Sequence, residues 1–578
     1  MENLFDVSRR SFLKGAASMA ATAPLVKTMS ALPLAVANTT SRSAKSTNPP
    51  EMVKVPEYMV YARVPDGRVI GMCHAGKNGQ YAARYSSDQG KTWTDPQPLF
   101  ELDGSIGSWA VHNAFLDHDG ELQLILTNDA HTTGHGKSLY DIHYDIWHLR
   151  SRNGRRDWNA PVSVWKGYAG SLLSFIQLRN GRVLLPFCYL THRNWANRGT
   201  GFEEFTYVGR FSSTAAYSDD NGQTWTLSPD ELYEPTPNLY ADGGIEPIAL
   251  QLKDGAVRMM IRTQDSRFFE SMSEDGSRWS HPLPTSIMSS DSPCSLTRLH
   301  DGRVVMLWNN TQRFPYANGG RAVLHGAISD DDGRTWRGYR EVAANPFDVE
   351  PPPRHGDHGV TYTVPTLTQE GTLITSLSVG GGNGYYLLRV DPEWLSETAH
   401  ATDLSKGLQD GWSTFGTKGV ELVANPANAG HQVLGIKHPD PGWPAGATWN
   451  FPSGRRGELR LRIYIAPEFG GGVVGLTDHF SVPFDEQDVF YNLFNFEIGA
   501  KGVLAHGSHL PTGRWNDLHF QWDCDRRECR VIHNGQTLAL APLMREQTPG
   551  PSYLRLRSTS HTPDNAGMFV ESASVNVS

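Results

Sequence analysis

The sequence predicts an all-β protein, with a six-bladed β-propeller followed by a β-sandwich of the jelly-roll type. Three observations lead to this fold class: a repeated turn motif that ends in Trp, six Gly turns that precede alternating apolar residues, and a change of pattern after Leu395. The composition agrees, because 578 residues with 39% hydrophobic side chains can bury large cores. The same composition argues against a disordered chain, a collagen or a coiled coil.

The first 37 residues are expected to be an export signal. Residues 8–14 read Ser-Arg-Arg-Ser-Phe-Leu-Lys, a mild apolar stretch follows, and residues 35–37 form an Ala-Val-Ala cleavage signal. This order is typical of the twin-arginine pathway, and it predicts a periplasmic or extracellular enzyme. Residues 38–51 are polar and rich in Ser and Thr, which is typical of a linker.

The repeated turn motif reads Ser-x-Asp-x-Gly-x-Thr-Trp. In such a motif the Ser and Asp side chains bond to nearby backbone N–H groups, Gly adopts a positive φ, and Trp packs the turn onto a sheet. One copy is a residue shorter, and another is more divergent. The copies are Ser86–Trp93, Ser151–Trp158, Ser218–Trp225, Ser273–Trp279 and Ser329–Trp336. Each copy predicts a tight turn between two strands.

A second repeat alternates with the first. An acidic residue or Asn is followed by Gly and then by alternating apolar residues, which is a strong hairpin signal. The dipeptides are Asp66-Gly67, Asp119-Gly120, Asn180-Gly181, Asp254-Gly255, Asp301-Gly302 and Glu370-Gly371. They lie 47 to 74 residues apart, a spacing that fits one four-stranded blade each. We therefore predict a six-bladed propeller over residues 52–398.

Residues 403–578 contain no copy of the turn motif. They show alternating strands such as 458–465 and 515–522, and the second of these is followed by a turn at Asn534-Gly535. This pattern resembles laminin-G-like and lectin-like domains, so we predict a β-sandwich here. Cys524 and Cys529 flank a predicted turn, where a disulfide and two free thiols are equal alternatives.

The tryptophan turns and the six-blade pattern resemble the sialidase (neuraminidase) superfamily, in which this turn is called the Asp-box or BNR repeat. The resemblance covers residues 52–398. Four residues match the site motifs of that family, namely Glu246, Arg262, Arg321 and Tyr362. The resemblance implies that Tyr362 is the nucleophile, that Glu246 is its base, and that Arg262 and Arg321 bind a substrate carboxylate.

The chemistry of these residue types agrees with that assignment. A phenol has a pKa of about 10 and is a weak nucleophile unless a base accepts its proton. A neutral Tyr suits a sugar whose anomeric carbon carries a carboxylate, because a charged nucleophile would be repelled. Paired guanidinium groups bind a carboxylate through two parallel hydrogen bonds, which Lys does less well.

Two positions depart from the family pattern. The Arg-Ile-Pro motif of the first strand corresponds best to Lys54-Val55-Pro56, and Arg63 is an alternative that lies very close to the turn at Asp66. The loop that carries the acid/base Asp in the family begins here at His74 and contains no Asp. His74 is our candidate acid, because its ordinary pKa of about 6.5 suits proton transfer. These departures favour a relative that acts on another acidic sugar.

Further candidates lie near predicted loops. His355 and His358 precede Tyr362, and His112 precedes a blade strand, where propeller loops face the central site. Trp109 is a candidate for a sugar subsite, with core packing as an equal alternative. No HExxH motif occurs in the sequence, and we predict neither a metal nor another cofactor.

The predicted function is that of an exported, exo-acting glycoside hydrolase that removes a terminal acidic sugar, sialic acid or a related one, from glycans. The alternatives are a lyase or hydrolase of uronate polysaccharides that uses His and Tyr, and a carbohydrate-binding propeller without activity. The expected partner is an acidic oligosaccharide or glycan. The net charge of −9 argues against nucleic acid as a partner, and no apolar run after residue 40 reaches the ~20 residues that span a membrane. The oligomeric state stays open.

Overall fold

A computed structural model describes most of the chain between residues 47 and 578, which form one compact unit. The described ranges are 47–132, 142–191, 210–233, 243–311, 321–345, 359–379, 384–414, 416–428, 430–481, 487–546 and 549–578. These ranges contain strands and short 3-10 helices but no α-helix. Across the same ranges, no helix has the length and apolar character that crossing a membrane requires. The all-β fold class is confirmed.

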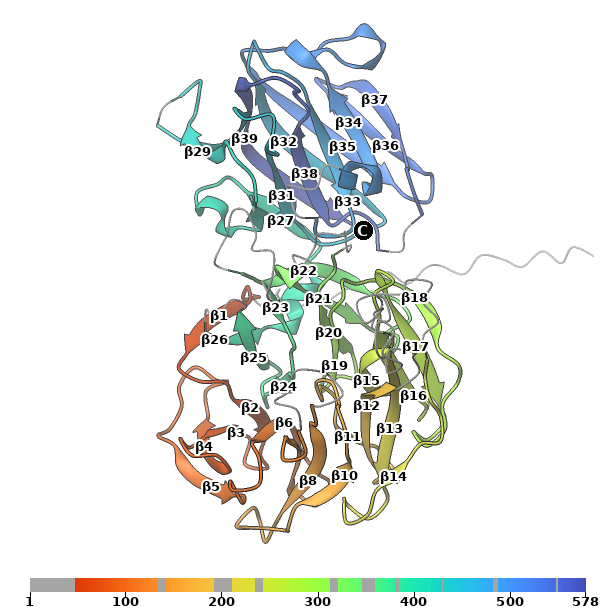
Figure 1. Ribbon diagram of the computed structural model, residues 1–578. Helices are drawn as coiled ribbons and strands as arrows, with labels where there is room; N and C mark the ends of the chain where they lie inside the picture. Colours follow the sequence, from red (N-terminus) through yellow and green to blue (C-terminus); the bar gives the residue numbers. More distant parts are fainter. Residues whose placement is uncertain are drawn as a thin grey trace, which may run out of the picture. The chain divides into compact units, whose positions relative to one another are not determined.

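Six antiparallel sheets follow one another around a ring in chain order, and we number them blades 1 to 6 (Figure 1). Blade 1 contains β2 (Val60–Arg63), β3 (Val69–His74), β4 (Gln80–Ser86) and β5 (Gln97–Glu101). Blade 2 contains β6 (Trp109–Leu116), β7 (Leu122–Asn128), β8 (Asp145–Arg152), β9 (Asp157–Trp158) and β10 (Val162–Trp165). Blade 3 contains β11 (Ile176–Gln177), β12 (Val183–Thr191), β13 (Arg210–Ser218) and β14 (Thr226–Leu227).

The other three blades repeat this order. Blade 4 contains β15 (Ile245–Gln251), β16 (Val257–Arg262), β17 (Arg267–Ser273) and β18 (Leu283–Met288). Blade 5 contains β19 (Ser295–Arg298), β20 (Val304–Trp308), β21 (Val323–Ser329) and β22 (Arg337–Ala344). Blade 6 contains β23 (Val360–Thr361), β24 (Thr366–Leu367), β25 (Leu373–Val379), β26 (Tyr385–Val390) and β1 (Glu51–Val55).

The first strand of the chain completes the last blade. β1 pairs antiparallel with β26, from Glu51 opposite Arg389 to Val55 opposite Tyr385. The sheet order is β1-β26-β25-β23, so β1 is the outermost strand of blade 6. The ring is thereby closed by strand pairing between the two ends of the propeller sequence.

Both repeats form turns at the same end of the ring. The Gly turns join the first and second strands of each blade, and the Asp-boxes join the third strand to the residues that lead into the fourth. In the first Asp-box, Gly90 N donates to Ser86 Oγ over 2.9 Å, and Thr92 N donates to Asp88 Oδ1 over 2.9 Å. Gly90 has a φ of 82°, which only Gly adopts without strain. The opposite end, which we call the loop end, carries the connections between second and third strands.

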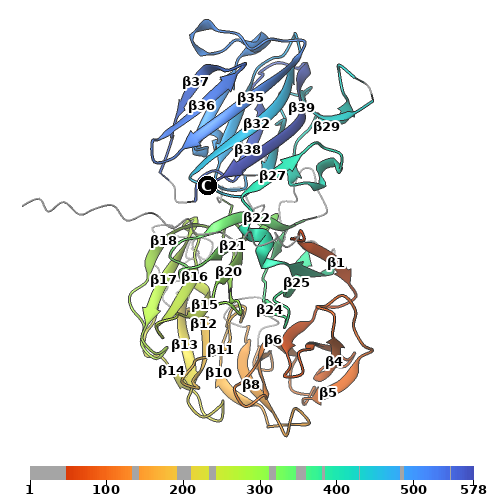
Figure 2. The same ribbon diagram turned by 180° about the vertical axis from the view of Figure 1, so that it is seen from behind.

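The C-terminal part is a sandwich of two sheets (Figure 2). The larger sheet has the order β29-β30-β39-β32-β35-β36-β37 with β27 paired to β39, and the smaller has the order β28-β31-β38-β33-β34. The larger sheet contains β27 (Ala399–Thr402), β29 (Val420–Ala424), β30 (Gln432–His438), β32 (Arg456–Ile465), β35 (Trp515–Asp523), β36 (Glu528–His533), β37 (Gln536–Pro542) and β39 (Asp564–Val577). The smaller sheet contains β28 (Trp412–Ser413), β31 (Gly446–Asn450), β33 (Gly472–Thr477), β34 (Phe494–Ile498) and β38 (Tyr553–Ser558). The 3-10 helices are η4 (Pro392–Ser396), η5 (Gly407–Gln409), η6 (Gln487–Tyr491), η7 (Ala500–Gly502) and η8 (Ala505–Gly507).

The core of the sandwich lies between its two sheets. Large aromatic side chains such as Trp449, Phe451 and Phe520 are almost completely buried there. Cys524 and Cys529 also belong to this core and are free thiols, so the alternative with two thiols is the one that the structure has.

A buried polar network joins the sandwich to blade 5. The Tyr553 hydroxyl on β38 donates to Glu341 on β22 over 2.7 Å and lies 2.5 Å from Nε2 of His325 on β21. Asn310 N donates to His325 Nδ1 over 3.1 Å, so this nitrogen is an acceptor. Burial lowers the pKa of His325 to about 3 and raises the pKa of Glu341 to about 7.

Candidate functional site

Two of the predicted site residues lie at, or next to, the end of a strand. Glu246 lies at the start of β15, where the pairing with β16 shifts register between Ile245 and Ile248. Tyr362 directly follows β23 in blade 6. Both residues have a left-handed backbone, with φ values of 48° and 61°. Such a conformation costs about 1–3 kcal/mol for a residue other than Gly and is often found at functional sites.

Arg262 connects these two side chains. It ends β16 directly opposite Ile245, and it is only 6% exposed. Its Nη1 donates to Glu246 Oε2 over 2.5 Å and to the Tyr362 hydroxyl over 3.1 Å. Burial alone would lower the pKa of Arg262, but Glu246 and Asp291 together raise it well above its ordinary value. The guanidinium is therefore charged, and it holds a carboxylate and a phenol on one nitrogen atom.

Arg321 completes the cluster from the segment just before β21 in blade 5. Its Nη2 lies 3.4 Å from the Tyr362 hydroxyl and 2.8 Å from the backbone oxygen of Asp291. Its guanidinium carbon lies 5.2 Å from the centre of the Tyr362 ring, which is a cation–π distance. Gly359 packs on Arg321 so closely that an added Cβ would lie 1.7 Å from the Arg321 carbonyl oxygen. The structure thus brings Tyr362, Glu246, Arg262 and Arg321 together.

The phenol of Tyr362 is neutral at ordinary pH. Burial and the nearby carboxylate of Glu246 raise its pKa, while Arg262 and Arg321 act in the opposite direction. A base is therefore required before this oxygen can attack an electrophile. Glu246 is the carboxylate that shares the Arg262 Nη1 donor with it, so it is the candidate base nearest to hand in this cluster.

Asp291 is a member of the cluster that the sequence analysis missed. Its Oδ1 accepts hydrogen bonds from Nε and Nη2 of Arg262, both over 2.9 Å, and its Oδ2 accepts from Gln264 over 2.9 Å. No common spacing in the sequence singles it out. Glu246 and Tyr362 each stand eight residues before the Gly-turn residue of their blade, and Asp291 stands ten residues before Asp301.

The segment that leads into blade 3 borders the Tyr362 cluster. Burial raises the pKa of Tyr168 to about 12, with smaller contributions from nearby groups that include Glu246 and Tyr362. At Gly170, an added Cβ would lie 2.7 Å from Cys188 Sγ and 3.5 Å from Glu246 Cγ. The absence of a side chain at Gly170 therefore leaves room for the Glu246 carboxylate.

His74 occupies another part of the loop end. It ends β3, and its Nε2 lies 3.4 Å from the Tyr81 hydroxyl. Burial lowers its pKa. His74 borders a cavity of about 760 Å³ that is also lined by Glu57, Tyr81 and Phe100. None of the residues that line this cavity belongs to the Tyr362 cluster.

The structure does not bring three other candidates into the cluster. Lys54 lies on β1, the outermost strand of blade 6, because this strand closes the ring instead of starting blade 1. Trp109 is 5% exposed and donates to the Asp103 carbonyl over 3.0 Å, so it is a core residue. His112 lies in a bulge of β6 with its Nε2 2.8 Å from Thr127 Oγ1, and burial lowers its pKa to about 4.

His355 and His358 lie outside the described residues. Their expected role near Tyr362 stays a prediction.

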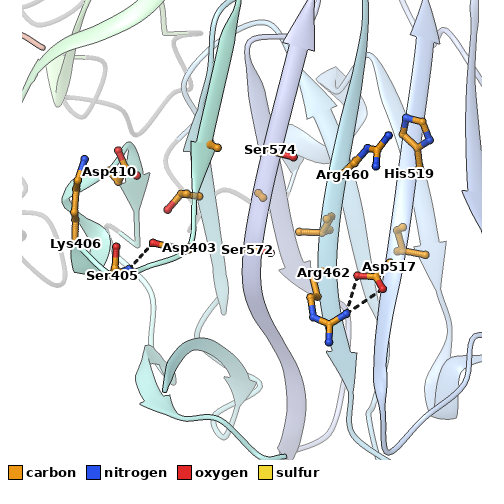
Figure 3. Close-up of a pocket in the computed structure, with 15 residues that line it drawn as sticks. Asp403, Ser405, Lys406, Asp410, Arg460, Arg462, Asp517, His519, Ser572 and Ser574 are labelled. Carbon is orange, nitrogen blue, oxygen red and sulfur yellow. Dashed lines mark hydrogen bonds and ion pairs between the residues drawn. The ribbon is translucent and has the colours of Figure 1, made fainter. Parts of the chain in front are cut away.

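A second cavity lies on the larger sheet of the sandwich (Figure 3). It measures about 740 Å³ and is lined by strands β27, β39, β32 and β35 and by the segment after β27. Figure 3 shows Arg460 and Arg462 on β32 beside Asp517 and His519 on β35. Arg462 is paired with both oxygens of Asp517, at 2.9 and 3.0 Å. Most of the residues that line this cavity are polar or charged, and none of them belongs to the propeller cluster.

Comparison with known proteins gives a family match. Residues 110–375 match the family model of the BNR repeat-like domain, from β6 into β25. Among curated proteins, no significant match was found. The sialidase of Trypanosoma rangeli in complex with 2,3-difluorosialic acid, a covalent intermediate, is 14% identical, with 90% of each chain covered and a TM-score of 0.39.

Two further solved structures are similar to part of the chain. A protein of unknown function from Dyadobacter fermentans is 14% identical, covering 60% of this chain and 99% of its own, with a TM-score of 0.42. The Hadza microbial sialidase Hz136 is 13% identical, covering 58% of this chain and 66% of its own, with a TM-score of 0.41. The family match and the Asp-box turns described above agree. Most of the propeller therefore matches the BNR repeat-like domain.

Proposed function

We propose that this protein is an exo-acting glycoside hydrolase that removes a terminal acidic sugar, of the sialic acid class, from glycans. The observation that carries the proposal is the shared donor at the loop end: Arg262 Nη1 is bonded both to the Glu246 carboxylate and to the Tyr362 hydroxyl. Glu246 and Tyr362, which both have strained backbones, are thus bonded to the buried guanidinium of Arg262. A merely structural role does not require a Tyr and a Glu in this conformation.

In the proposed first step, Tyr362 Oη attacks the anomeric carbon of the terminal sugar. The Tyr362 proton passes to Glu246, a bond forms between Oη and the anomeric carbon, and the bond to the leaving oxygen breaks. A general acid protonates that oxygen. Water then attacks the anomeric carbon and gives one proton to the general acid, which the first step left deprotonated. The bond between Oη and the anomeric carbon breaks, and the phenol leaves with its proton returned from Glu246. Because the attacking group is a neutral phenol, a carboxylate on the anomeric carbon does not repel it.

The two arginines have different roles in this proposal. The N–H groups of Arg262 donate hydrogen bonds to Glu246, Asp291 and Tyr362. Arg262 therefore positions the nucleophile and the base. Arg321 also approaches the Tyr362 hydroxyl, and we assign it to the carboxylate of the substrate. Arg suits this contact because its planar fork matches the two carboxylate oxygens.

A trapping experiment tests the assignment of the nucleophile. Incubation with 2,3-difluorosialic acid should add one sugar to the peptide that contains Tyr362, as measured by mass spectrometry. Tyr362→Phe should not be labelled, and its kcat on a fluorogenic sialoside should fall by at least about 10³-fold. Tyr385→Phe is the matched control, since Tyr385 is 41% exposed and lies on β26. Labelling at another residue, or normal turnover by Tyr362→Phe, would reject the proposal.

The same assay separates the alternative functions. A hydrolase releases a free acidic sugar and a new hydroxyl group on the glycan, whereas a uronate lyase creates an unsaturated product that absorbs ultraviolet light. Sialosides and uronate polymers should therefore be offered in parallel, with absorbance and released sugar measured together. Binding without any product would indicate a carbohydrate-binding propeller.

We also propose that the protein is exported in folded form. The support is the Arg9-Arg10 pair with the apolar stretch and the Ala-Val-Ala site that follow it. Replacing both Arg9 and Arg10 with Lys should retain the protein in the cytoplasm, as measured by cell fractionation. Unchanged export of that variant would contradict the proposal.

A further inference from the structure

Two histidines and one aspartate converge at the loop end of blade 2. Asp145 is the first residue of β8 and lies opposite Asn128, the last residue of β7. His131 follows β7, and His143 precedes β8. Within the described ranges, these three residues form a group whose potential ligand atoms all lie within 4.8 Å of one another.

The carboxylate of Asp145 stands between the two imidazole rings. Its Oδ2 pairs with Nδ1 of His131, and its Oδ1 lies 3.2 Å from Nδ1 of His143. The Asp145 side chain is 1% exposed, whereas those of His131 and His143 are 51% and 34% exposed. The group therefore has a buried anionic base and an open rim, through which an ion can enter from solvent.

The surrounding backbone fixes these side chains in place. Gly167 N donates to Asp145 Oδ1 over 2.8 Å, which orients the carboxylate. The hydroxyl of Thr132 accepts from His143 N over 3.0 Å and donates to the His143 carbonyl over 3.2 Å. The segments that carry the two histidines are thus bonded to each other. Hydrogen bonds of this kind, made to the residues that bind a metal, usually hold metal ligands in place in proteins.

We propose that His131, His143 and Asp145 bind one divalent transition-metal ion, of which Zn²⁺ is the best match. Two imidazole nitrogens and one carboxylate oxygen are a ligand set that Zn²⁺ accepts, whereas Ca²⁺ and Mg²⁺ prefer oxygen ligands alone. Three protein ligands leave a fourth position for water or an oxygen of a bound molecule. In the metal-bound protein the ion lies between the two Nδ1 atoms and the carboxylate oxygens that they approach.

The site borders the propeller cluster through two aromatic rings. Tyr144 lies between His143 and Asp145 in the chain, and its ring centre is 5.5 Å from that of Tyr168. Tyr144 N also donates to the Gly167 carbonyl over 2.8 Å. Tyr168 is the residue of blade 3 that neighbours Glu246. A bound ion therefore stabilises the segment around Tyr144 that packs against Tyr168. The proposal does not depend on the proposed glycosidase activity.

The sequence alone predicts no metal at this position. The three ligands do not form a known motif, because their proximity depends on the pairing of β7 with β8. The spacing of 12 residues from His131 to His143 does not identify a site without that pairing.

Metal binding to the whole protein, stripped with a chelator and free of any histidine tag, tests the proposal. Titration with Zn²⁺ should give one site per chain by calorimetry, and the thermal midpoint should rise on addition of Zn²⁺. In H131Q/H143Q the affinity should fall by more than about 100-fold, since outer contacts alone are worth 10–100-fold. H118Q/H281Q, with both histidines exposed, is the matched control and should bind like the wild type. Equal binding by H131Q/H143Q overturns the proposal, as does no binding by the wild type.

A spectroscopic measurement on the wild-type protein makes the test independent of variant folding. Co²⁺ should give visible d–d bands of a four- or five-coordinate site, and one equivalent of Zn²⁺ should abolish them. Excess Ca²⁺ should leave the bands unchanged, because a hard cation does not displace an imidazole-bound ion. A spectrum like that of hydrated Co²⁺, or displacement by Ca²⁺, contradicts the proposed ligand set.

Discussion

Replacement of Arg262 by Met tests the electrostatic centre of the propeller site. Met fills a similar apolar volume but leaves Glu246, whose side chain is 7% exposed, without its partner. Asp291 loses the same partner, although its side chain is 21% exposed and can be partly solvated. Removal of one member of a buried ion pair costs about 3–5 kcal/mol, because a buried charge remains unpaired.

The expected thermal shift follows from the size of the propeller. About 340 residues that unfold together have an unfolding entropy of about 0.7 kcal/mol/K, so this loss lowers the midpoint by about 4–7 °C. Differential scanning calorimetry measures the shift. Activity on a sialoside should fall as well, since Tyr362 and Glu246 lose the donor that they share.

A double-mutant cycle identifies the cause of the loss. Glu246→Gln removes the charge that Arg262→Met leaves unpaired, so the double variant should be more stable than the sum of the two single changes predicts. A coupling free energy of about 1–3 kcal/mol is expected. Additive effects within about 0.5 kcal/mol would refute the argument that the Arg262–Glu246 pair stabilises the site.

Three further predictions concern other parts of the chain. Gly359→Ala should displace Arg321, because the Arg321 carbonyl oxygen would lie 1.7 Å from the new Cβ. This variant should raise KM for an acidic substrate more than it lowers kcat. An unchanged KM would contradict the role of Arg321. His325 has its pKa lowered by burial to about 3, so the unfolded state binds the extra proton, and stability decreases as pH falls from about 6.5 toward 3. His325→Gln should reduce the slope of the unfolding free energy in that window by about 1.4 kcal/mol per pH unit; an equal slope in urea titrations at several pH values would rule this out. Asp88→Ala should destabilise blade 1 by about 1–3 kcal/mol in the same measurement, because the backbone N–H and hydroxyl of Thr92 lose their acceptor; no change would show that water replaces these bonds.

The repeats determined the fold, whereas the site required the three-dimensional pairing. Each Gly turn and each Asp-box carries its own hydrogen bonds within a few residues, so local sequence was sufficient to place the blades. Lys54 was assigned to the first blade because sequence order suggests it, but its strand pairs with β26 across the ring. Asp291 was missed because its loop has no motif of its own, and its role depends on Arg262, which lies 29 residues earlier in the chain.

The pairing of β1 with β26 affects folding during synthesis and the outcome of proteolysis. During synthesis the first strand must wait for its partner, because β26 emerges from the ribosome more than 300 residues later. A protein that loses Glu51–Val55 to a protease keeps the whole Tyr362 cluster but exposes the free edge of β26, and open edges recruit strands from other molecules. Trimming at this point should therefore produce aggregates of otherwise intact rings.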